Sequence, residues 1–211
     1  MHIQEYFKQA RTLIGNQSYE KLGQLPLDKP EYFNWVEEVF HNINVVEHGN
    51  EKALIWRYYD KEKVYSFKDI YLKSNQFLNL LRQHGATQGD RIYSLLPLVP
   101  ANWLSFVATI KGGFIMMPTA TNLTSRDLIY RFESLFPEIF ITNLANVEKI
   151  NEAERTFGKP IKLKICTDGA AEGWVSLAEM NQEPTAAKAA KTKADDAVLY
   201  FFTSGTTGLP K

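Results

Sequence analysis

The chain has 211 residues, of which 45% are hydrophobic and 23% are charged, so it has an ordinary globular composition. Its 24 Lys and Arg equal its 24 Asp and Glu, and this zero net charge argues against a nucleic-acid partner or an anionic membrane surface. The single cysteine, Cys166, excludes an internal disulfide, and Pro97 and Pro100 interrupt the longest uncharged run, residues 92–110. We therefore expect a cytoplasmic protein with no membrane span.

The first third of the sequence predicts a helical arm and a hairpin. Residues 1–34 are aromatic and proline-rich and predict a helix followed by a wrapping arm, and residues 34–48 form a further helical stretch. The runs KALIWRYY and KVYSF are strand-like and are joined by the polar turn DKEK at residues 60–63.

The middle of the sequence alternates helices and strands. Ser66 with Asp69, and Thr124 with Asp127, are typical of helix N-termini with a capping box, and Gly85 favours a helix end. The predicted strands are RIYSLL, FIMMP, EIFITN and KLKIC, separated by the helices ANWLSFVATIKG, DLIYRFESLF and NVEKINEAERTF. This order predicts an α/β fold with a parallel sheet covered on both faces and right-handed βαβ connections.

The end of the sequence changes in character. Residues 181–196 lack large apolar side chains, so they predict an exposed linker. The apolar run AVLYFF at residues 197–202 predicts a strand, and the small-residue loop TSGTTGLPK follows it. We therefore divide the chain into an arm (1–34), an α/β subdomain (35–180), a linker (181–196) and a strand with a truncated loop (197–211).

The loop at residues 203–211 has the composition of a phosphate-binding loop. Its glycines let backbone N–H groups approach an anion, its hydroxyl groups add donors, and its terminal lysine adds a mobile positive charge. Composition alone also fits a flexible tail, and the Walker A spacing is absent. The candidate phosphate-binding residues are Thr203, Ser204, Gly205, Thr206, Thr207, Gly208, Leu209, Pro210 and Lys211.

The order of residues in this loop resembles the phosphate-loop signature of the adenylate-forming (AMP-binding) superfamily. Two further blocks resemble the same family: an early block from KVYSFKDI to the helix ending LLRQHGATQGDRI, and a second block, from LPLVPANW to RDLIYRF, of the kind found in its medium-chain acyl-CoA synthetase branch. The segments KPEYFNWVEEVF and DGAAEGWVSLAEM resemble its medium-chain acyl-CoA synthetase branch. The similarity covers about residues 30–211, and the chain is expected to be part of the large N-terminal domain of such an enzyme.

The resemblance implies an acid–thiol ligase that uses ATP, Mg²⁺ and CoA. ATP and a carboxylic acid would give an acyl-adenylate and pyrophosphate, and the CoA thiol would then attack the adenylate. Residues 203–211 would wrap the β- and γ-phosphates, and Lys211 would orient the leaving pyrophosphate. The resemblance favours short- or medium-chain acids of fatty acid metabolism, and the sequence offers no metal ligand of its own.

Other candidate residues have simpler structural interpretations. Asp195 and Asp196 could hold a metal but better fit the end of a linker, and Cys166 fits a small buried hydrophobe. Arg126 and Arg131 are expected as surface cations, or in a packing role that the resemblance indicates. The histidines are too scattered for catalysis or a metal cluster: His2, His41, His48 and His84. Three tryptophans are expected to anchor the core: Trp35, Trp103 and Trp174.

The sequence lacks an aromatic–Gly–x–Thr–Glu block and a Thr-Gly-Asp segment, which the resemblance assigns to adenine, Mg²⁺ and ribose. The small C-terminal domain with its catalytic lysine is also expected in a missing remainder of the same enzyme. Two hypotheses remain. Either the chain is an N-terminal fragment of an acyl-CoA synthetase, inactive alone, or it is a stand-alone non-catalytic module that binds a partner or acts as a folding unit.

Overall fold

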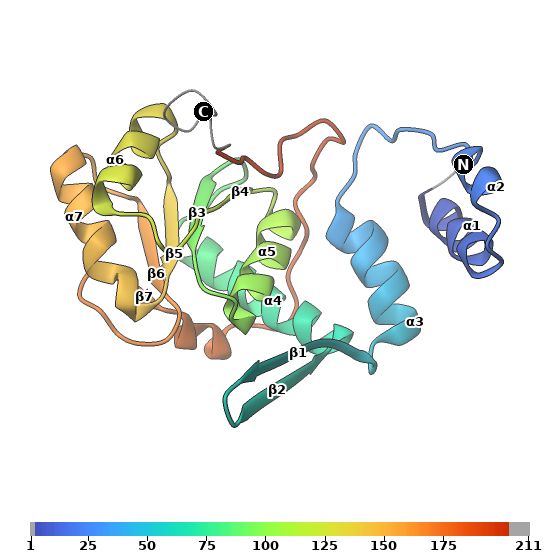
Figure 1. Cartoon of the computed structure of the whole chain (residues 1–211), viewed down its shortest axis with the longest axis horizontal. Helices are drawn as coiled ribbons and strands as arrows, with labels where there is room; N and C mark the ends of the chain where they lie inside the picture. The colour runs from blue at the N-terminus through green and yellow to red at the C-terminus, as the bar shows by residue number, and fades with distance from the viewer. Residues whose placement is uncertain (1–2, 203–211) are drawn as a thin grey trace.

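The computed structural model describes residues 3–202, which form an α/β layered structure with a helical arm to one side (Figure 1). In this range the central sheet has five parallel strands, in the order β4 (Ile115–Pro118), β3 (Arg91–Leu95), β5 (Ile139–Thr142), β6 (Leu163–Cys166) and β7 (Val175–Ser176). The predicted parallel α/β fold is confirmed. β7 lies in a stretch where no strand was predicted, and it adds only two residues at the edge.

Helices cover the two faces of the sheet, as the predicted crossovers require. α4 (Phe67–Gln83) and α5 (Pro100–Gly112) pack on one face, and α6 (Ser125–Ser134) and α7 (Val147–Phe157) pack on the other (Figure 1). Strand residues alternate between the two cores: Ile92 faces α4 and α5, whereas Tyr93 faces α6 and α7. The fold therefore has two cores, one on each side of the sheet.

Both predicted capping boxes are confirmed. The Ser66 hydroxyl accepts from the Asp69 N–H, and the Asp69 carboxylate accepts from the Ser66 N–H, at the start of α4. Thr124 and Asp127 make the same reciprocal pair at the start of α6, so this helix begins and ends two residues earlier than predicted.

The hairpin joins β1 (Lys52–Tyr58) to β2 (Lys61–Ser66), as predicted, but its turn is shorter. Lys61 pairs with Tyr58, so Tyr59 and Asp60 alone form the turn and the prediction of residues 60–63 is wrong. A two-residue hairpin turn needs positive φ, and Tyr59 has φ 52°.

The arm consists of α1 (Ile3–Gly15), α2 (Tyr19–Gly23) and an extended segment that leads into the next helical stretch (Figure 1). That stretch was predicted over residues 34–48 and is helical, but most of it is the π-helix η1 (Val36–Val45), which α3 (Val46–His48) extends. Asn34 begins it, because its side-chain oxygen accepts from the Val36 N–H. No helix in the described range 3–202 is long and apolar enough to span a membrane.

The short 3-10 segments η2 (Leu144–Asn146) and η3 (Leu177–Gln182) complete the connections. After η3, residues 183–196 are mainly exposed, as their composition predicted, but they are fastened along α4 by hydrogen bonds and are not a loose spacer.

The strand predicted over residues 197–202 is wrong in extent. Only Leu199 forms a bridge, parallel to Met116 of β4, through Met116 N–H to Val198 O at 2.9 Å and Tyr200 N–H to Met116 O at 3.0 Å. The next rung of a parallel ladder would need an N–H at position 118, and Pro118 has none to donate. The physical limit on this strand is therefore the proline that ends β4.

Candidate functional site

The predicted phosphate loop, residues 203–211, lies outside the described residues, but the segment that leads to it does not. Because Leu199 pairs in parallel with Met116, residues 200–202 run toward the same edge at which β3 and β4 end. This pairing directs the described chain toward the carboxyl edge of the sheet up to Phe202, which comes immediately before the predicted loop. This edge is the candidate functional site.

The topology supports this edge as a ligand-binding location. The connection after β3 leads to α5 on one face of the sheet, whereas the connection after β5 leads to α7 on the other face. Neighbouring strands whose connections leave in opposite directions form a switch point, where open α/β sheets bind ligands. The loops that follow β3 and β5 expose apolar side chains there: Leu98 is 80% exposed and Leu144 is 48% exposed.

Polar groups hold the loops of this edge in place. The Thr119 N–H donates to Ser94 O at 2.8 Å, and the Thr142 hydroxyl donates to Leu95 O at 2.8 Å. On the far side, the Leu144 N–H donates to the Asp168 carboxylate at 2.6 Å. These bonds tie the strand ends to one another and make the edge a fixed platform.

Arg131 contacts Phe202, the residue before the predicted loop; the sequence left it either as a surface cation or in a packing role. Its guanidinium carbon is 4.5 Å from the centre of the Phe202 ring, and its Nε is buried without a hydrogen-bond partner among residues 3–202. The packing interpretation of Arg131 therefore fits better, whereas Arg126 is exposed as predicted. Beside it, burial raises the pKa of Tyr93, and the positive charge of Arg131 opposes this rise.

A buried charge cluster was missed by the sequence analysis. The Lys111 ammonium is 1% exposed and is bound by Glu37 at 2.7 Å, the Asn75 amide oxygen at 2.8 Å and the Tyr71 hydroxyl at 2.9 Å. Lys111 lies in the last turn of α5, where a lysine is usually a surface cation. It joins three elements, η1, α4 and α5, and is structural, because it lies in the core and away from the carboxyl edge.

The remaining candidates have structural roles. Asp195 forms an exposed ion pair with Lys29 of the arm, and the Asp196 carboxylate accepts from the Lys193 N–H at 2.8 Å and so stabilises the turn before the bridge. Among residues 3–202 no three His, Cys, Asp or Glu side chains gather where a metal ion could bind. Cys166 is buried at the end of β6, as predicted.

The described histidines contact neighbouring side chains, and two of the three tryptophans expected as anchors pack in the cores. His41 packs on the Tyr71 ring, His48 contacts Glu51, and His84 lies near Glu179, whereas His2 is outside the described residues. Trp35 and Trp174 pack in the two cores as predicted. The prediction for Trp103 is wrong: it is 49% exposed on the outer side of α5.

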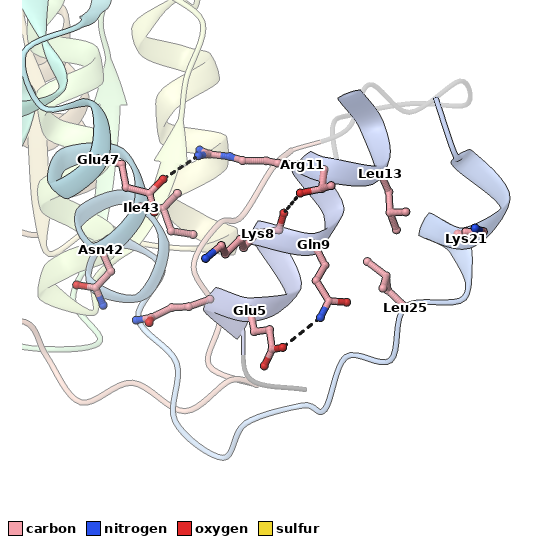
Figure 2. Close-up of a pocket in the computed structure, with 12 residues that line it drawn as sticks. Glu5, Lys8, Gln9, Arg11, Leu13, Lys21, Leu25, Asn42, Ile43 and Glu47 are labelled. Carbon is pink, nitrogen blue, oxygen red and sulfur yellow. Dashed lines mark hydrogen bonds and ion pairs between the residues drawn. The ribbon is translucent and has the colours of Figure 1, made fainter. Parts of the chain in front are cut away.

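A cavity of about 1000 Å³ lies far from this edge, between α1, α2 and η1. Figure 2 shows an ion pair across it, Arg11 with Glu47 at 3.6 Å, and a hydrogen bond within α1, from the Gln9 amide to Glu5 at 3.1 Å. It is a seam between the arm and the α/β body, and none of the predicted site residues lines it.

The sheet topology and its carboxyl edge define the class of doubly wound α/β proteins that bind ligands at a switch point. The sequence matches the AMP-binding enzyme family over residues 42–211. The chain belongs to that family, and the predicted membership is confirmed.

Sequence identities to individual proteins support this family membership. The chain is 40% identical over 192 residues to 4-hydroxybutyrate–CoA ligase 1 of Metallosphaera sedula, covering 90% of this chain and 32% of the relative. It is 32% identical over 202 residues to the human mitochondrial acyl-coenzyme A synthetase ACSM3, covering 92% and 34%. It therefore spans about a third of the length of the curated relatives it matches.

Solved structures show the same fold. An anthranilate CoA ligase, AuaEII, in complex with anthranoyl-AMP superposes with a TM-score of 0.76 at 24% identity, covering 86% of this chain and 34% of the other. An acyl-CoA synthetase of Brucella canis gives 0.75 at 23% identity, covering 92% and 35%. The described residues thus have the fold of part of the N-terminal domain of adenylate-forming enzymes.

Proposed function

We propose that the chain is the N-terminal part of an ATP-dependent carboxylate–CoA ligase that forms an acyl-adenylate and then an acyl-CoA thioester. One observation carries this proposal: the family match extends through residue 211 and so includes the whole loop TSGTTGLPK. The names of the relatives, a 4-hydroxybutyrate–CoA ligase and acyl-coenzyme A synthetases, support the reaction class. The partners are a carboxylic acid of short or medium chain, ATP and CoA.

In this proposal residues 203–211 bind the β- and γ-phosphates, and Lys211 orients the leaving pyrophosphate. Backbone N–H groups beside Gly205 and Gly208, with the hydroxyls of Thr206 and Thr207, would meet the charge that builds on the leaving group. The support from the structure is the parallel bridge of Leu199 with Met116, which directs the described chain toward the carboxyl edge of the sheet up to Phe202, the residue before the loop.

Mg²⁺ would accompany ATP and neutralise phosphate charge. We assign it no ligand, because the last described carboxylates before the loop in sequence, Asp195 and Asp196, already have partners: Lys29 for Asp195 and the Lys193 N–H for Asp196.

We also propose the division into arm, α/β subdomain, linker and loop-bearing segment at residues 34, 180 and 196, and a cytoplasmic location. The ACSM3 relatives are mitochondrial by name, so fractionation of the expressing cell decides the compartment. Residues 1–211 alone should not catalyse adenylation, because they lack the segments that the resemblance assigns to adenine and ribose.

Carboxylate-dependent exchange of labelled pyrophosphate into ATP tests the proposed function. The full-length protein that contains this chain is assayed against a series of acids from two to twelve carbons and an aromatic acid. Exchange with one or more acids supports the ligase. A folded full-length protein that exchanges with none of them contradicts it, and turnover by residues 1–211 alone contradicts the predicted inactivity.

A further inference from the structure

One polar face of α4 is directed at the segment of residues 183–194, here called the strap. Side chains of α4 and of the turn after it donate to main-chain oxygens of the strap. The bonds, in order along the strap, are Gln76 to Glu183 O (3.0 Å), Asn79 to Pro184 O (2.8 Å) and Ala186 O (2.9 Å), Asn75 to Thr185 O (2.8 Å), Arg82 to Lys188 O (2.7 Å) and Gln88 to Lys191 O (3.2 Å).

Hydrogen bonds, more than hydrophobic burial, hold the strap against α4. Apart from Pro184, the apolar side chains of the strap are alanines, and of these only Ala187 packs against the core. Asn79 is the central bond donor, because its amide bridges two carbonyls of the strap, those of Pro184 and Ala186. Burial lowers the pKa of Arg82, in keeping with a guanidinium that the strap partly shields from water.

The far end of the strap is fastened to two other elements. The Ala190 N–H donates to Lys111 O at 2.8 Å, and the Ala194 N–H donates to Glu31 O at 3.1 Å. Gly113, with φ 68°, lies directly below: a Cβ atom there would be 3.0 Å from side chains of Ala190 and Thr192. The strap therefore fits α4, the end of α5 and the arm in one position along its length.

This position fixes what comes next. Residues 195–197 alone separate Ala194, which is bonded to the arm, from Val198, which is bonded to β4. A shift of the strap by one residue would turn Leu199 away from the core and place Val198 or Tyr200 there. The position of the strap along α4 therefore determines which of residues 198–200 pairs with β4.

We propose that α4, through Asn79 and with Asn75 and Arg82 in support, is the positioning element for the root of the phosphate loop. Its side chains select the register of the strap, and the strap sets where residues 198–202 meet the sheet. The consequence for ATP rests on the proposed function, whereas the positioning itself does not.

Residue-resolved amide hydrogen exchange on the chain of residues 1–211 tests the proposal. Asn79→Ala removes both bridging bonds without weakening α4, since Ala has a higher helix propensity than Asn. The two lost bonds should speed exchange about tenfold at the Ala190 and Ala194 amides, and also at the Met116 and Tyr200 amides of the bridge. Gln83→Ala, an exposed change on the same helix, is the matched control and should change none of them.

Faster exchange at both places supports the proposal. Faster exchange in the strap with no change at Met116 and Tyr200 overturns it, because α4 would then hold the strap without positioning the bridge. No change at either place overturns it as well. If Asn79→Ala does not fold, Arg82→Ala removes one bond at a half-buried position and carries the same comparison.

Pyrophosphate exchange by the full-length protein separates the two proposals. With the wild-type full-length protein active, Asn79→Ala should raise the KM for ATP by about tenfold while the KM for the acid stays within twofold, and Gln83→Ala should change neither. A general loss of stability would move both constants or the amount of active enzyme, and would count against a positioning role. An inactive wild-type protein with the expected amide exchange contradicts the proposed function and leaves the positioning intact.

Discussion

The buried ion pair of Lys111 and Glu37 should make an unusually large contribution to stability, and the two partners should not be equivalent. Lys111 is 1% exposed and all three of its N–H donors are used, whereas the Glu37 side chain is 33% exposed. Glu37→Ala leaves a buried charge with only the neutral acceptors of Tyr71 and Asn75. Removing one partner of a buried pair costs about 3–5 kcal/mol, and the two remaining acceptors reduce this to about 2–3 kcal/mol.

Lys111→Met removes the charge itself and keeps most of the apolar stem. The partly exposed Glu37 regains water, so the main loss is the unsatisfied Asn75 oxygen, at about 1–2 kcal/mol. In the Lys111→Met background Glu37→Ala should therefore cost less than about 1 kcal/mol. The loss of stability in Glu37→Gln should lie between zero and that of Glu37→Ala, because the Gln amide oxygen still accepts from the ammonium.

Urea unfolding at pH 7, followed by far-UV circular dichroism, measures these differences for all four members of the double-mutant cycle. Glu38→Ala, on the same helix and without an ion pair among the described residues, is the control and should stay within about 0.5 kcal/mol of wild type. The reasoning is refuted if Glu37→Ala costs no more than Glu38→Ala, or if it costs as much with Met at position 111 as with Lys.

Three further changes test other parts of the structure. Arg131→Ala should cost about 1 kcal/mol through the lost contact with the ring before the loop, whereas Arg126→Ala should be near neutral; equal urea midpoints would contradict the packing role of Arg131. Burial alone would raise the pKa of Glu138, but the bonds from Arg91 hold it below its ordinary value. The resulting stability is present above pH 4.5 and is lost as the pH falls through the depressed value, so Glu138→Gln should flatten the decline between pH 5 and 3; parallel curves for variant and wild type would disprove this. Gly112→Ala should cost about 1–3 kcal/mol, since its methyl would clash with the Phe114 ring and lie 2.7 Å from the Leu78 side chain of α4; an unchanged thermal midpoint would contradict this.

Local signals predicted the fold well where they depend on a few neighbouring residues. The capping boxes at Ser66 and Thr124 place the starts of two helices, and the order of strands and helices gives the parallel sheet. The prediction of the hairpin turn was wrong because Lys61 pairs with Tyr58, so the polar residues 61–63 belong to the strand and not to the turn.

Features that depend on distant residues were not predictable in the same way. Burial of Lys111 follows from Glu37, which lies 74 positions earlier and on another element. The fastening of the strap comes from side chains of α4 more than a hundred positions away, so its polar composition indicated only exposure. For the candidate site, the sequence supplied residues 203–211, and the structure supplied the edge to which Phe202 leads and the presence of Arg131 beside it.

The central claim, that residues 203–211 serve the adenylation step of a carboxylate–CoA ligase, is tested most directly by the two half-reactions of Lys211→Ala in the full-length protein. Acid-dependent pyrophosphate exchange reports adenylation, and CoA thioester formation from supplied acyl-adenylate reports the second step. We expect adenylation to fall by about 100-fold or more while thioester formation stays within about threefold. Equal slowing of both half-reactions, or unchanged pyrophosphate exchange, would contradict it.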